Sequence, residues 1–235
     1  MGTKNSLQAL PLTPSKGIVL LSGGLDSTVL LAHCLSEGHD MVGLCMYYGQ
    51  RHVKEMEAAK AVADYYEIDL IEMDLGPIFK LDGDCTLLGN AHEIPKGAYK
   101  NGEVPSTYVP FRNGLFLATA SSIALQLGAT FVVFGAHAND AAAAYPDCTV
   151  SFGNAIAAAV AEGTARKVSV HAPFIMLTKG DIVECGIDLE VPFGITWSCY
   201  EGGDKPCGKC ATCLDRAKAF EANGIMKESD YDKQD

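Results

Sequence analysis

Two stretches of this chain bring together residue types that can do chemistry. In the first, residues 17–28 (GIVLLSGGLDST), an apolar run is followed by two glycines, hydroxyl groups and a carboxylate. The run is typical of a buried parallel strand, and the hydroxyls of Ser27 and Thr28 are placed to cap a following helix. Gly23 and Gly24 let the backbone take positive φ and approach a ligand closely. The stretch predicts a nest of N–H groups for phosphate or pyrophosphate; the alternative is a glycine turn with ordinary capping residues.

The second stretch holds four cysteines in the pattern Cys-x7-Cys-x2-Cys-x2-Cys. Four thiolates suit a closed, tetrahedral and therefore structural zinc site, which would hold a segment that has too few apolar residues to dock alone. The main alternative is an iron–sulfur cluster, because Cys-x2-Cys-x2-Cys also occurs in ferredoxin-type ligation. The remaining alternative is unligated or redox-active cysteines. The candidate ligands are Cys199, Cys207, Cys210 and Cys213.

The composition is typical of a globular protein that acts on a small molecule. The 235 residues suffice for one large domain or one domain with a small appendage. A formal charge of −11 disfavours nucleic acid as a partner, because nonspecific affinity for it comes largely from neutralising phosphates. The sequence has no apolar run near the roughly 20 residues of a bilayer span, and it begins without the apolar core of a signal peptide. We therefore expect a cytoplasmic protein with no membrane partner.

Strands and helices are expected to alternate along most of the chain. Apolar runs predict buried strands at 18–21, 41–47, 70–73, 131–134 and 168–172. Helices are predicted at 27–37, 53–66, 114–127 and 152–162. A further short helix should be capped by Thr178. This alternation predicts a doubly wound, Rossmann-like parallel α/β sheet that binds ligands at the carboxyl ends of its strands.

Two segments break the alternation. Residues 74–107 are rich in glycine, proline and mixed charge, which is typical of a lid or substrate loop. A second loop is expected through 141–144. The predicted organisation is a flexible N-terminal tail at 1–16, a nucleotide-binding α/β domain at 17–195 and a zinc-binding C-terminal segment at 196–235.

Several motifs together resemble a known family. Ser-Gly-Gly-x-Asp-Ser after a strand resembles the PP-loop of the ATP pyrophosphatases, and it is not a Walker loop, because no Gly-Lys-Ser/Thr follows. The whole set is similar to the 7-cyano-7-deazaguanine synthase family (QueC family), and Gly135-Ala-His-Ala138 and the stretch 163–168 look like an archaeal or viral branch of it. The motifs are Ser22–Ser27, Tyr48-Gly-Gln-Arg-His52, Val104–Pro110 with Arg112-Asn113, Tyr145-Pro-Asp-Cys148, Thr196-Trp-Ser-Cys-Tyr200 and Gly203–Cys210.

The resemblance implies an ATP-dependent carbon–nitrogen ligase. Such an enzyme converts 7-carboxy-7-deazaguanine and ammonia to the nitrile through an adenylylated carboxylate and an amide, within the pathways to queuosine or archaeosine. It implies a fold of the adenine nucleotide alpha hydrolase type, ATP, Mg²⁺ and Zn²⁺ as cofactors, and a homodimer. The alternative is a paralogue that stops at the amide or transfers the activated acid to a protein or another macromolecular amine. Ala141–Ala144, in place of the residues that many family members carry there, allows this alternative.

The resemblance also implies roles for individual residues. Those that would hold the ATP phosphates are Ser22, Gly23, Gly24, Asp26 and Ser27, with Asp26 acting through its turn or through magnesium. Asp26, Arg51 and Lys179 are the catalytic candidates; the two cations would neutralise pyrophosphate or carboxylate charge, or else are solvated surface groups. The substrate-binding candidates are Tyr108, Arg112, Tyr145 and Asp147, for which core aromatics, a surface salt bridge and a turn aspartate are the alternatives. His137 is a proton shuttle or a structural histidine.

Overall fold

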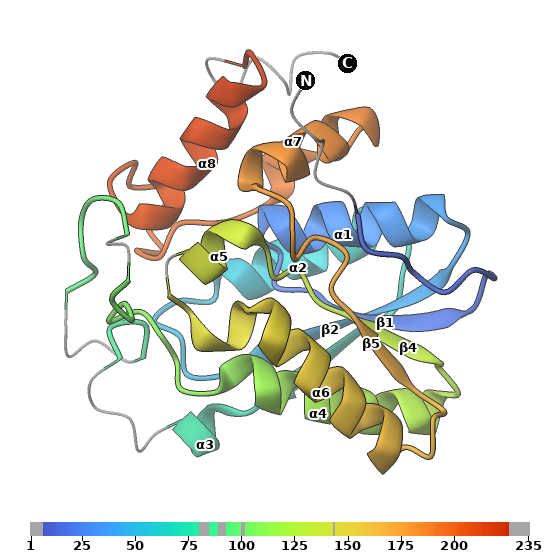
Figure 1. Cartoon of the computed structure of the whole chain (residues 1–235). Coiled ribbons are helices and arrows are strands. Elements are labelled where there is room, and N and C mark those ends of the chain that lie inside the picture. Colours follow the sequence, from blue (N-terminus) through green and yellow to red (C-terminus); the bar gives the residue numbers. More distant parts are fainter. Residues whose placement is uncertain (1–6, 80–84, 89–92, 100–101, 143, 226–235) are drawn as a thin grey trace.

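A parallel sheet lies at the centre of the protein and brings the carboxyl ends of its strands to one edge (Figure 1). The structure is a computed structural model that describes residues 7–79, 85–88, 93–99, 102–142 and 144–225. Within these ranges the sheet has five strands in the order β3-β2-β1-β4-β5, and each neighbouring pair is parallel. The strands are β1 (Lys16–Leu20), β2 (Asp40–Tyr47), β3 (Leu70–Asp74), β4 (Phe131–Val133) and β5 (Ser169–His171). The chain winds outward in both directions from β1, so the crevice between β1 and β4 is the expected ligand site.

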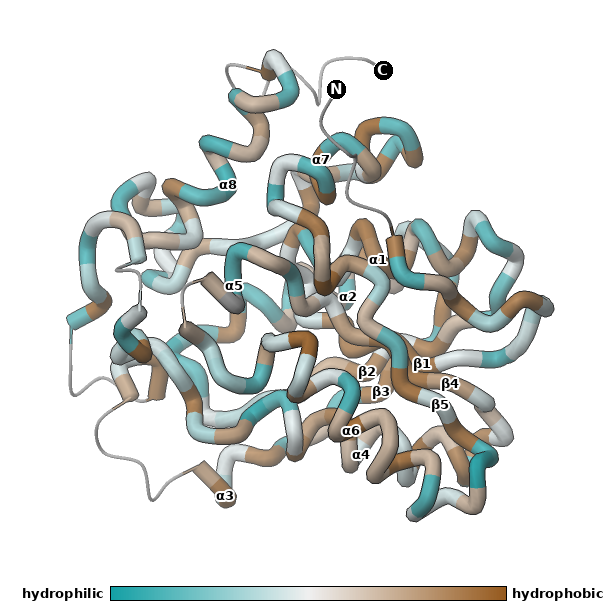
Figure 2. Tube along the Cα trace, viewed as in Figure 1, coloured by the Kyte–Doolittle hydropathy of each residue, from teal (hydrophilic) through white to brown (hydrophobic). Residues whose placement is uncertain are grey.

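Helices cover both faces of the sheet (Figure 1). One face carries α1 (Leu25–Ser36), α2 (Lys54–Tyr65) and α7 (Lys179–Asp188), and the other carries α4 (Arg112–Leu127) and α6 (Val150–Gly163). Successive residues of β1 enter different cores: Val19 packs with α1 and Ile18 packs with α4. Hydrophobic residues accordingly run through the strands in Figure 2. The predicted doubly wound α/β class is confirmed.

The remaining elements are short or lie at the C-terminal side. They are α3 (Gly76–Phe79), α5 (Ala138–Ala142), the 3₁₀ helices η1 (Pro146–Cys148) and η2 (Phe193–Ile195), and α8 (Ala211–Ala222). The sequence patterns predicted neither α5 nor α8. Helix α8 packs on α7, and its buried residues include Arg216 and Phe220. Among the helices of the described residues, none is long and apolar enough to cross a membrane.

The predicted strands and helices are present with their ends shifted by a few residues, but two local predictions are wrong. The hydroxyls of Ser27 and Thr28 do not cap α1; both donate to the carbonyl of Gly24, at 3.1 and 2.8 Å, one turn before them. Gly24 itself is extended (φ −79°), so only Gly23 uses the left-handed conformation (φ +75°). A hydroxyl inside the first turn bonds back to the preceding carbonyl because that acceptor lies within its reach.

The predicted excursion and N-terminal tail are described only in part. Of the excursion at 74–107, residues 80–84, 89–92 and 100–101 lie outside the described residues, as do 1–6 and 226–235 at the termini. Within the described part, Lys96 forms an isolated bridge with Cys210, and Gly97 N–H donates to the carbonyl of Lys209 at 2.9 Å. At the N-terminal side, Gln8 N–H donates to the carbonyl of Pro173. The lid and the domain boundaries stay predictions.

The two glycines of the first motif give a matched test of the turn. A β-carbon on Gly23 would lie 2.3 Å from Ala59 N and 2.5 Å from the carbonyl oxygen of Glu55, both backbone atoms of α2. We expect Gly23→Ala to lower the free energy of unfolding by more than about 1 kcal/mol, because it adds a backbone clash to a strained φ. In Gly24→Ala the nearest atom is a side-chain oxygen at 3.2 Å, so the change should be within about 0.5 kcal/mol. Urea unfolding measures both, and equal loss in the two variants would contradict this account of the turn.

Candidate active site

A cavity of about 250 Å³ opens at the carboxyl ends of β1, β2 and β4. Its wall combines segments that are far apart in the sequence: the glycine turn, the end of β2, the start of α4, the residues after β4, and the cysteine-rich segment. The predicted site residues that line it are Ser22, Gly24, Asp26, Ser27, Arg112, His137 and Lys179. The position at the reversal of strand order is the one at which open α/β sheets bind ligands.

The glycine turn exposes groups suited to phosphate. Gly24 N–H donates to Ser22 Oγ at 3.2 Å, and the hydroxyls of Ser22 and Ser27 lie 3.1 Å apart. The turn leads directly into the first turn of α1, whose residues 25–27 line the cavity. The first N–H groups of a helix have no partner within the helix and form the positive end of its dipole. Because α2 packs against Gly23 at backbone contact distance, the turn is held from behind. This arrangement can hold a phosphate chain.

Asp26 and Lys179 form an ion pair in the cavity wall. Lys179 Nζ donates to Asp26 Oδ2 at 2.7 Å. Thr178 and Asp181 form a capping box at the start of α7, and Lys179 N–H donates to Asn139 Oδ1, so the backbone of Lys179 is fixed. Burial alone would raise the pKa of Asp26, but the charges of Lys179 and His137 outweigh it and hold that pKa well below its usual range. The pair therefore keeps a full negative and a full positive charge at neutral pH.

His137 belongs to the same cluster. Its side chain is 3% exposed, and Nε2 lies 3.7 Å from Asp26 Oδ2 and 3.5 Å from Asp140 Oδ2. Burial lowers the pKa of His137, but the two carboxylates overcome this effect and raise it above the ordinary value. The second oxygen of Asp26, Oδ1, is buried and has no hydrogen-bond partner among the described residues. A buried carboxylate oxygen of this kind can accept a cation or a ligand donor.

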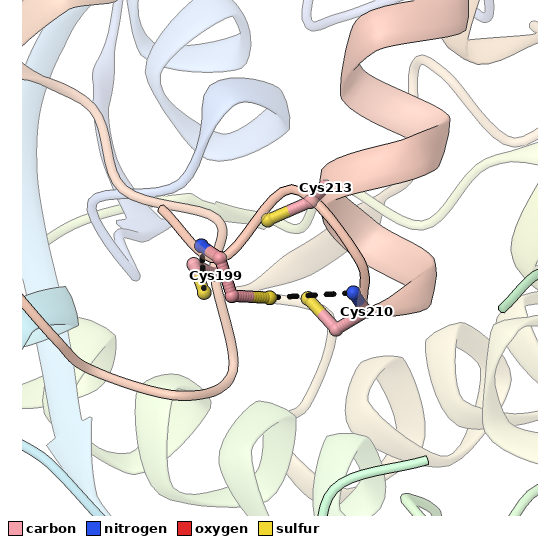
Figure 3. Close-up of side chains that lie close together, drawn as sticks. Cys199, Cys210 and Cys213 are labelled. Carbon is pink, nitrogen blue, oxygen red and sulfur yellow. Dashed lines mark hydrogen bonds between the residues drawn. The ribbon is translucent and has the colours of Figure 1, made fainter. Parts of the chain in front are cut away.

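The four cysteines of the second motif lie close together, and Figure 3 labels three of them, Cys199, Cys210 and Cys213. Their sulfur atoms all lie within 4.8 Å of one another. Tetrahedral zinc with Zn–S bonds near 2.3 Å places its sulfurs about 3.8 Å apart, so the cluster fits this metal. Backbone N–H groups of Glu201 and Cys207 donate to Cys199 Sγ, and those of Lys209 and Cys210 donate to Cys207 Sγ, at 3.3–3.4 Å. Such bonds stabilise thiolates, and the cluster can hold a zinc ion.

The cysteine-rich segment also builds one wall of the cavity. Trp197 N–H donates to the carbonyl of Gly23 at 2.9 Å, which ties the segment to the glycine turn. The Trp197 indole donates to the Cys199 carbonyl at 2.7 Å, and the Thr212 hydroxyl donates to the Ser198 carbonyl at 2.7 Å. These bonds fix the stretch that lines the cavity between the turn and the cysteines.

The excursion docks on the same segment. The hydroxyls of Tyr99 and Tyr200, both in the cavity wall, lie 2.9 Å apart, and Lys96 forms an ion pair with Glu201. Part of the predicted substrate loop thus contacts the cysteine-rich segment and reaches the cavity.

Apart from the four cysteines, five predicted site residues are not part of the cavity wall as the described residues form it. The hydroxyls of Tyr145 and Thr107 form a hydrogen bond with each other. The hydroxyl of Tyr108 accepts from the backbone N–H of Phe111 at 2.9 Å. Asp147 accepts from Asn113 N–H at 2.9 Å and so holds the first turn of α4. These five residues are Gly23, Arg51, Tyr108, Tyr145 and Asp147.

Conversely, several wall residues were not singled out from the sequence. Glu55 lies in the first turn of α2, and Asp215 lies in α8, a helix that the patterns did not predict. Tyr48 and Tyr200 stand inside motifs that resemble the family, which was the available signal for them. Glu55 follows the motif at 48–52 by three residues, and its approach to the cavity depends on how α2 packs behind the turn.

The fold resembles that of an enzyme of known structure. An NMN synthetase from Francisella tularensis superposes with a TM-score of 0.52 at 18% sequence identity, covering 94% of this chain and 87% of that one. At this identity the likeness concerns the fold alone, and it agrees with the doubly wound sheet described above.

The sequence relatives are closer and cover nearly the whole chain. A 7-cyano-7-deazaguanine synthase from Archaeoglobus fulgidus is 42% identical over 89% of this chain and 87% of its own length. The enzyme of the same name from Picrophilus torridus is 40% identical over 93% and 92%, and that from Caldicellulosiruptor saccharolyticus is 36% identical over 92% and 96%. Archaeal relatives are thus present, as the resemblance implied. The family model described as queuosine biosynthesis protein QueC matches residues 16–224, and the chain therefore belongs to the QueC family.

Proposed function

We propose that this protein is a 7-cyano-7-deazaguanine synthase, which converts 7-carboxy-7-deazaguanine, ammonia and ATP to the nitrile. The observation that carries the proposal is the single cavity in which a phosphate-binding turn with its Asp26–Lys179 pair faces the Trp-Ser-Cys-Tyr wall at 197–200. The family model matches residues 16–224, a range that includes both the glycine turn and this wall.

The proposed reaction removes both oxygens of a carboxylate in two activations. The carboxylate attacks the α-phosphorus of ATP to form an acyl adenylate and pyrophosphate; ammonia then displaces AMP and loses a proton to give the amide. The amide oxygen attacks a second ATP and releases pyrophosphate, and the adenylylated intermediate loses AMP and the two protons of its nitrogen to leave the carbon–nitrogen triple bond. Each activation attaches AMP to an oxygen that is itself a poor leaving group, so that the oxygen departs as part of AMP. The enzyme must therefore hold a triphosphate and a flat heterocycle together.

The glycine turn and the ion pair have the proposed role of holding the triphosphate. N–H groups and hydroxyls of residues 22–27 would contact phosphate oxygens, and Lys179 would balance the charge that develops on departing pyrophosphate. Asp26 orients the Lys179 ammonium through its Oδ2, and Oδ1 remains for another partner. Asp26 and Asp140 are the residues that would hold Mg²⁺. When bound, this cation would neutralise negative charge on the phosphate oxygens. The contribution of Arg51 to pyrophosphate charge stays a prediction.

The substrate-binding residues divide into one that lines the cavity and three that support its wall. Arg112 is partly buried, lines the cavity and is the proposed direct contact to the substrate. Asp147 fixes the start of α4, from which Arg112 extends, by accepting from Asn113 N–H. Tyr108 and Tyr145 lie near each other, with ring centroids 6.4 Å apart. Their proposed role is to position this wall, without contacting the substrate themselves. The comparisons give no support to a paralogue that stops at the amide or modifies a macromolecule.

A homodimer is part of the proposal. Helix α6 is rich in alanine, and Val160 is its one buried residue among those described, so much of its apolar surface faces outward. Val150 at the start of this helix and the neighbouring Phe111 are exposed apolar side chains, and the Phe111 ring lies 6.1 Å from that of Phe152. An apolar helix face of this kind suits contact with a second copy.

The identity of the product tests the proposed function directly. Purified protein incubated with ATP, ammonia and 7-carboxy-7-deazaguanine should form the nitrile, with AMP and pyrophosphate as the nucleotide products. Mass spectrometry of the small molecules and phosphorus NMR of the nucleotides measure this. Accumulation of the amide, an adduct on the protein, or failure to consume ATP would each contradict the proposal.

Removing the buried cation should reduce turnover far more than removing a surface one. We expect Lys179→Gln to lower kcat/KM by roughly 10²–10³-fold, the usual loss when a preorganised electrostatic group is removed. The matched control is Lys60→Gln, which breaks the exposed Lys60–Glu72 ion pair and should leave kcat/KM within about twofold. Circular dichroism checks that both variants fold. A folded Lys179→Gln enzyme with nearly full activity would contradict the assigned role.

The metal content tests the cysteine cluster. We expect about one zinc per chain by elemental analysis, and its loss in Cys213→Ser, because structural zinc needs all four ligands. Cys185→Ser, which changes a cysteine outside the cluster, should keep the zinc. The first variant should also unfold at a lower temperature, since metal binding contributes to folding. Iron and sulfide in place of zinc, or full zinc content in Cys213→Ser, would contradict the assignment.

A further inference from the structure

The cavity wall contains two opposite charges that no ion pair joins. Glu55 and Arg112 both line the cavity, and each charge shifts the pKa of the other group. No ion pair joins them within 4.0 Å, and among the described residues no hydrogen bond or ion pair holds the Glu55 carboxylate. Leaving a charge in a cavity wall without a partner is costly, unless a ligand provides the partner.

Arg112 is fixed in place but keeps free donor capacity. Its guanidinium lies over the Tyr48 ring at 4.9 Å and over the Phe116 ring at 5.9 Å, and one N–H donates to the Tyr48 hydroxyl at 3.0 Å. A guanidinium has five N–H donors in a planar fork, so it can also donate to a ligand in the cavity. No carboxylate lies within ion-pair distance of Arg112 among the described residues.

An acceptor beside a donor is the complement of one edge of a guanine-type ring. That edge presents O6 as an acceptor, followed by N1–H and the exocyclic amine as donors. A carboxylate has two oxygens and can accept from both donors, and a guanidinium can donate to O6. The six-membered ring of adenine instead presents a donor amine beside an acceptor nitrogen, which would face the Glu55 carboxylate unfavourably. The pair therefore suits the deazaguanine better than the base of ATP.

We propose that Glu55 and Arg112 recognise the six-membered ring of the substrate, Glu55 by accepting from N1–H and the exocyclic amine and Arg112 by donating to O6. This inference rests on the proposed function, and it adds a specificity-determining residue, Glu55, together with the atoms that Arg112 contacts. Burial in the wall raises the pKa of Glu55, although Arg112 offsets part of this effect. The paired donors of the base would satisfy the carboxylate in the bound state.

The substitution Glu55→Gln tests the pair. It keeps the shape and removes the charge, and because the pKa of Glu55 is raised, burial of this carboxylate costs stability above its unfolded pKa. The variant should therefore fold, and its unfolding temperature should be equal to or higher than that of the wild type. The probe is the ratio of kcat/KM for 7-carboxy-7-deazaguanine to that for its analogue without the exocyclic amine.

The wild-type ratio should be roughly 10² or more, because a site built for a donor is left unpaired by the analogue. In Glu55→Gln we expect the ratio to fall at least tenfold, with the KM for ATP within twofold of wild type. The matched control is Glu57→Gln on the same helix, where Glu57 is exposed and pairs with Lys54; its ratio should equal that of the wild type. An equal loss of kcat/KM for the acid and for its analogue, or a raised KM for ATP with the ratio unchanged, would overturn the inference.

Two further arms separate this inference from the proposed function. If the wild type turns over neither base, the proposed function fails, and calorimetric binding of the acid then tests the inference alone. We expect at least tenfold weaker binding to Glu55→Gln, and equal affinity would overturn it. If Glu55→Gln does not fold, Arg112→Lys replaces it with the 6-amino analogue as probe. Reduced discrimination against that analogue supports the inference, and unchanged discrimination overturns it.

Discussion

The hydrogen bond from Trp197 N–H to the carbonyl of Gly23 is the contact on which the site depends. It joins the glycine turn near the N-terminal end of the chain to the segment that carries the four cysteines. On one side of this bond, α2 packs against Gly23 at backbone distance. On the other side, Cys199, two residues after Trp197, belongs to the cluster of four sulfurs. A zinc ion would therefore organise the cavity wall without contacting the reactants.

The charges in the cavity fall into two classes with different consequences. Asp26 and Lys179 are paired at 2.7 Å, and each keeps its charge because of the other, so this pair is ready before any ligand arrives. Glu55 and Arg112 influence each other's pKa but form no ion pair, so a ligand is needed to provide hydrogen-bond partners for both. The first class suits a group that must meet the high charge of a triphosphate. The second suits recognition, since an unpaired site rejects a base with the wrong edge.

Much of the fold could be predicted because β1 and β2 are apolar runs long enough to identify, and the glycine turn sits where a strand meets a helix. The cysteine spacing likewise determined which four sulfurs would meet. Helix α8 escaped prediction because alanines and charged residues fill most of it, and its stability comes from packing on α7 and from Arg216, which donates to the carbonyl of Phe193 at 2.9 Å. Glu55 escaped because a carboxylate in a helical first turn is ordinary in sequence. Its place in the cavity wall with Arg112 depends on tertiary packing.

The central claim is that one cavity holds the nucleotide and the deazaguanine acid together, with the phosphates on the glycine turn and the base between Glu55 and Arg112. A crystal structure with a non-hydrolysable ATP analogue and 7-carboxy-7-deazaguanine tests it most directly. The account predicts phosphate oxygens against the N–H groups and hydroxyls of residues 22–27, and the six-membered ring between Glu55 and Arg112. Phosphates bound away from the turn, or an acid bound outside this cavity, would contradict it.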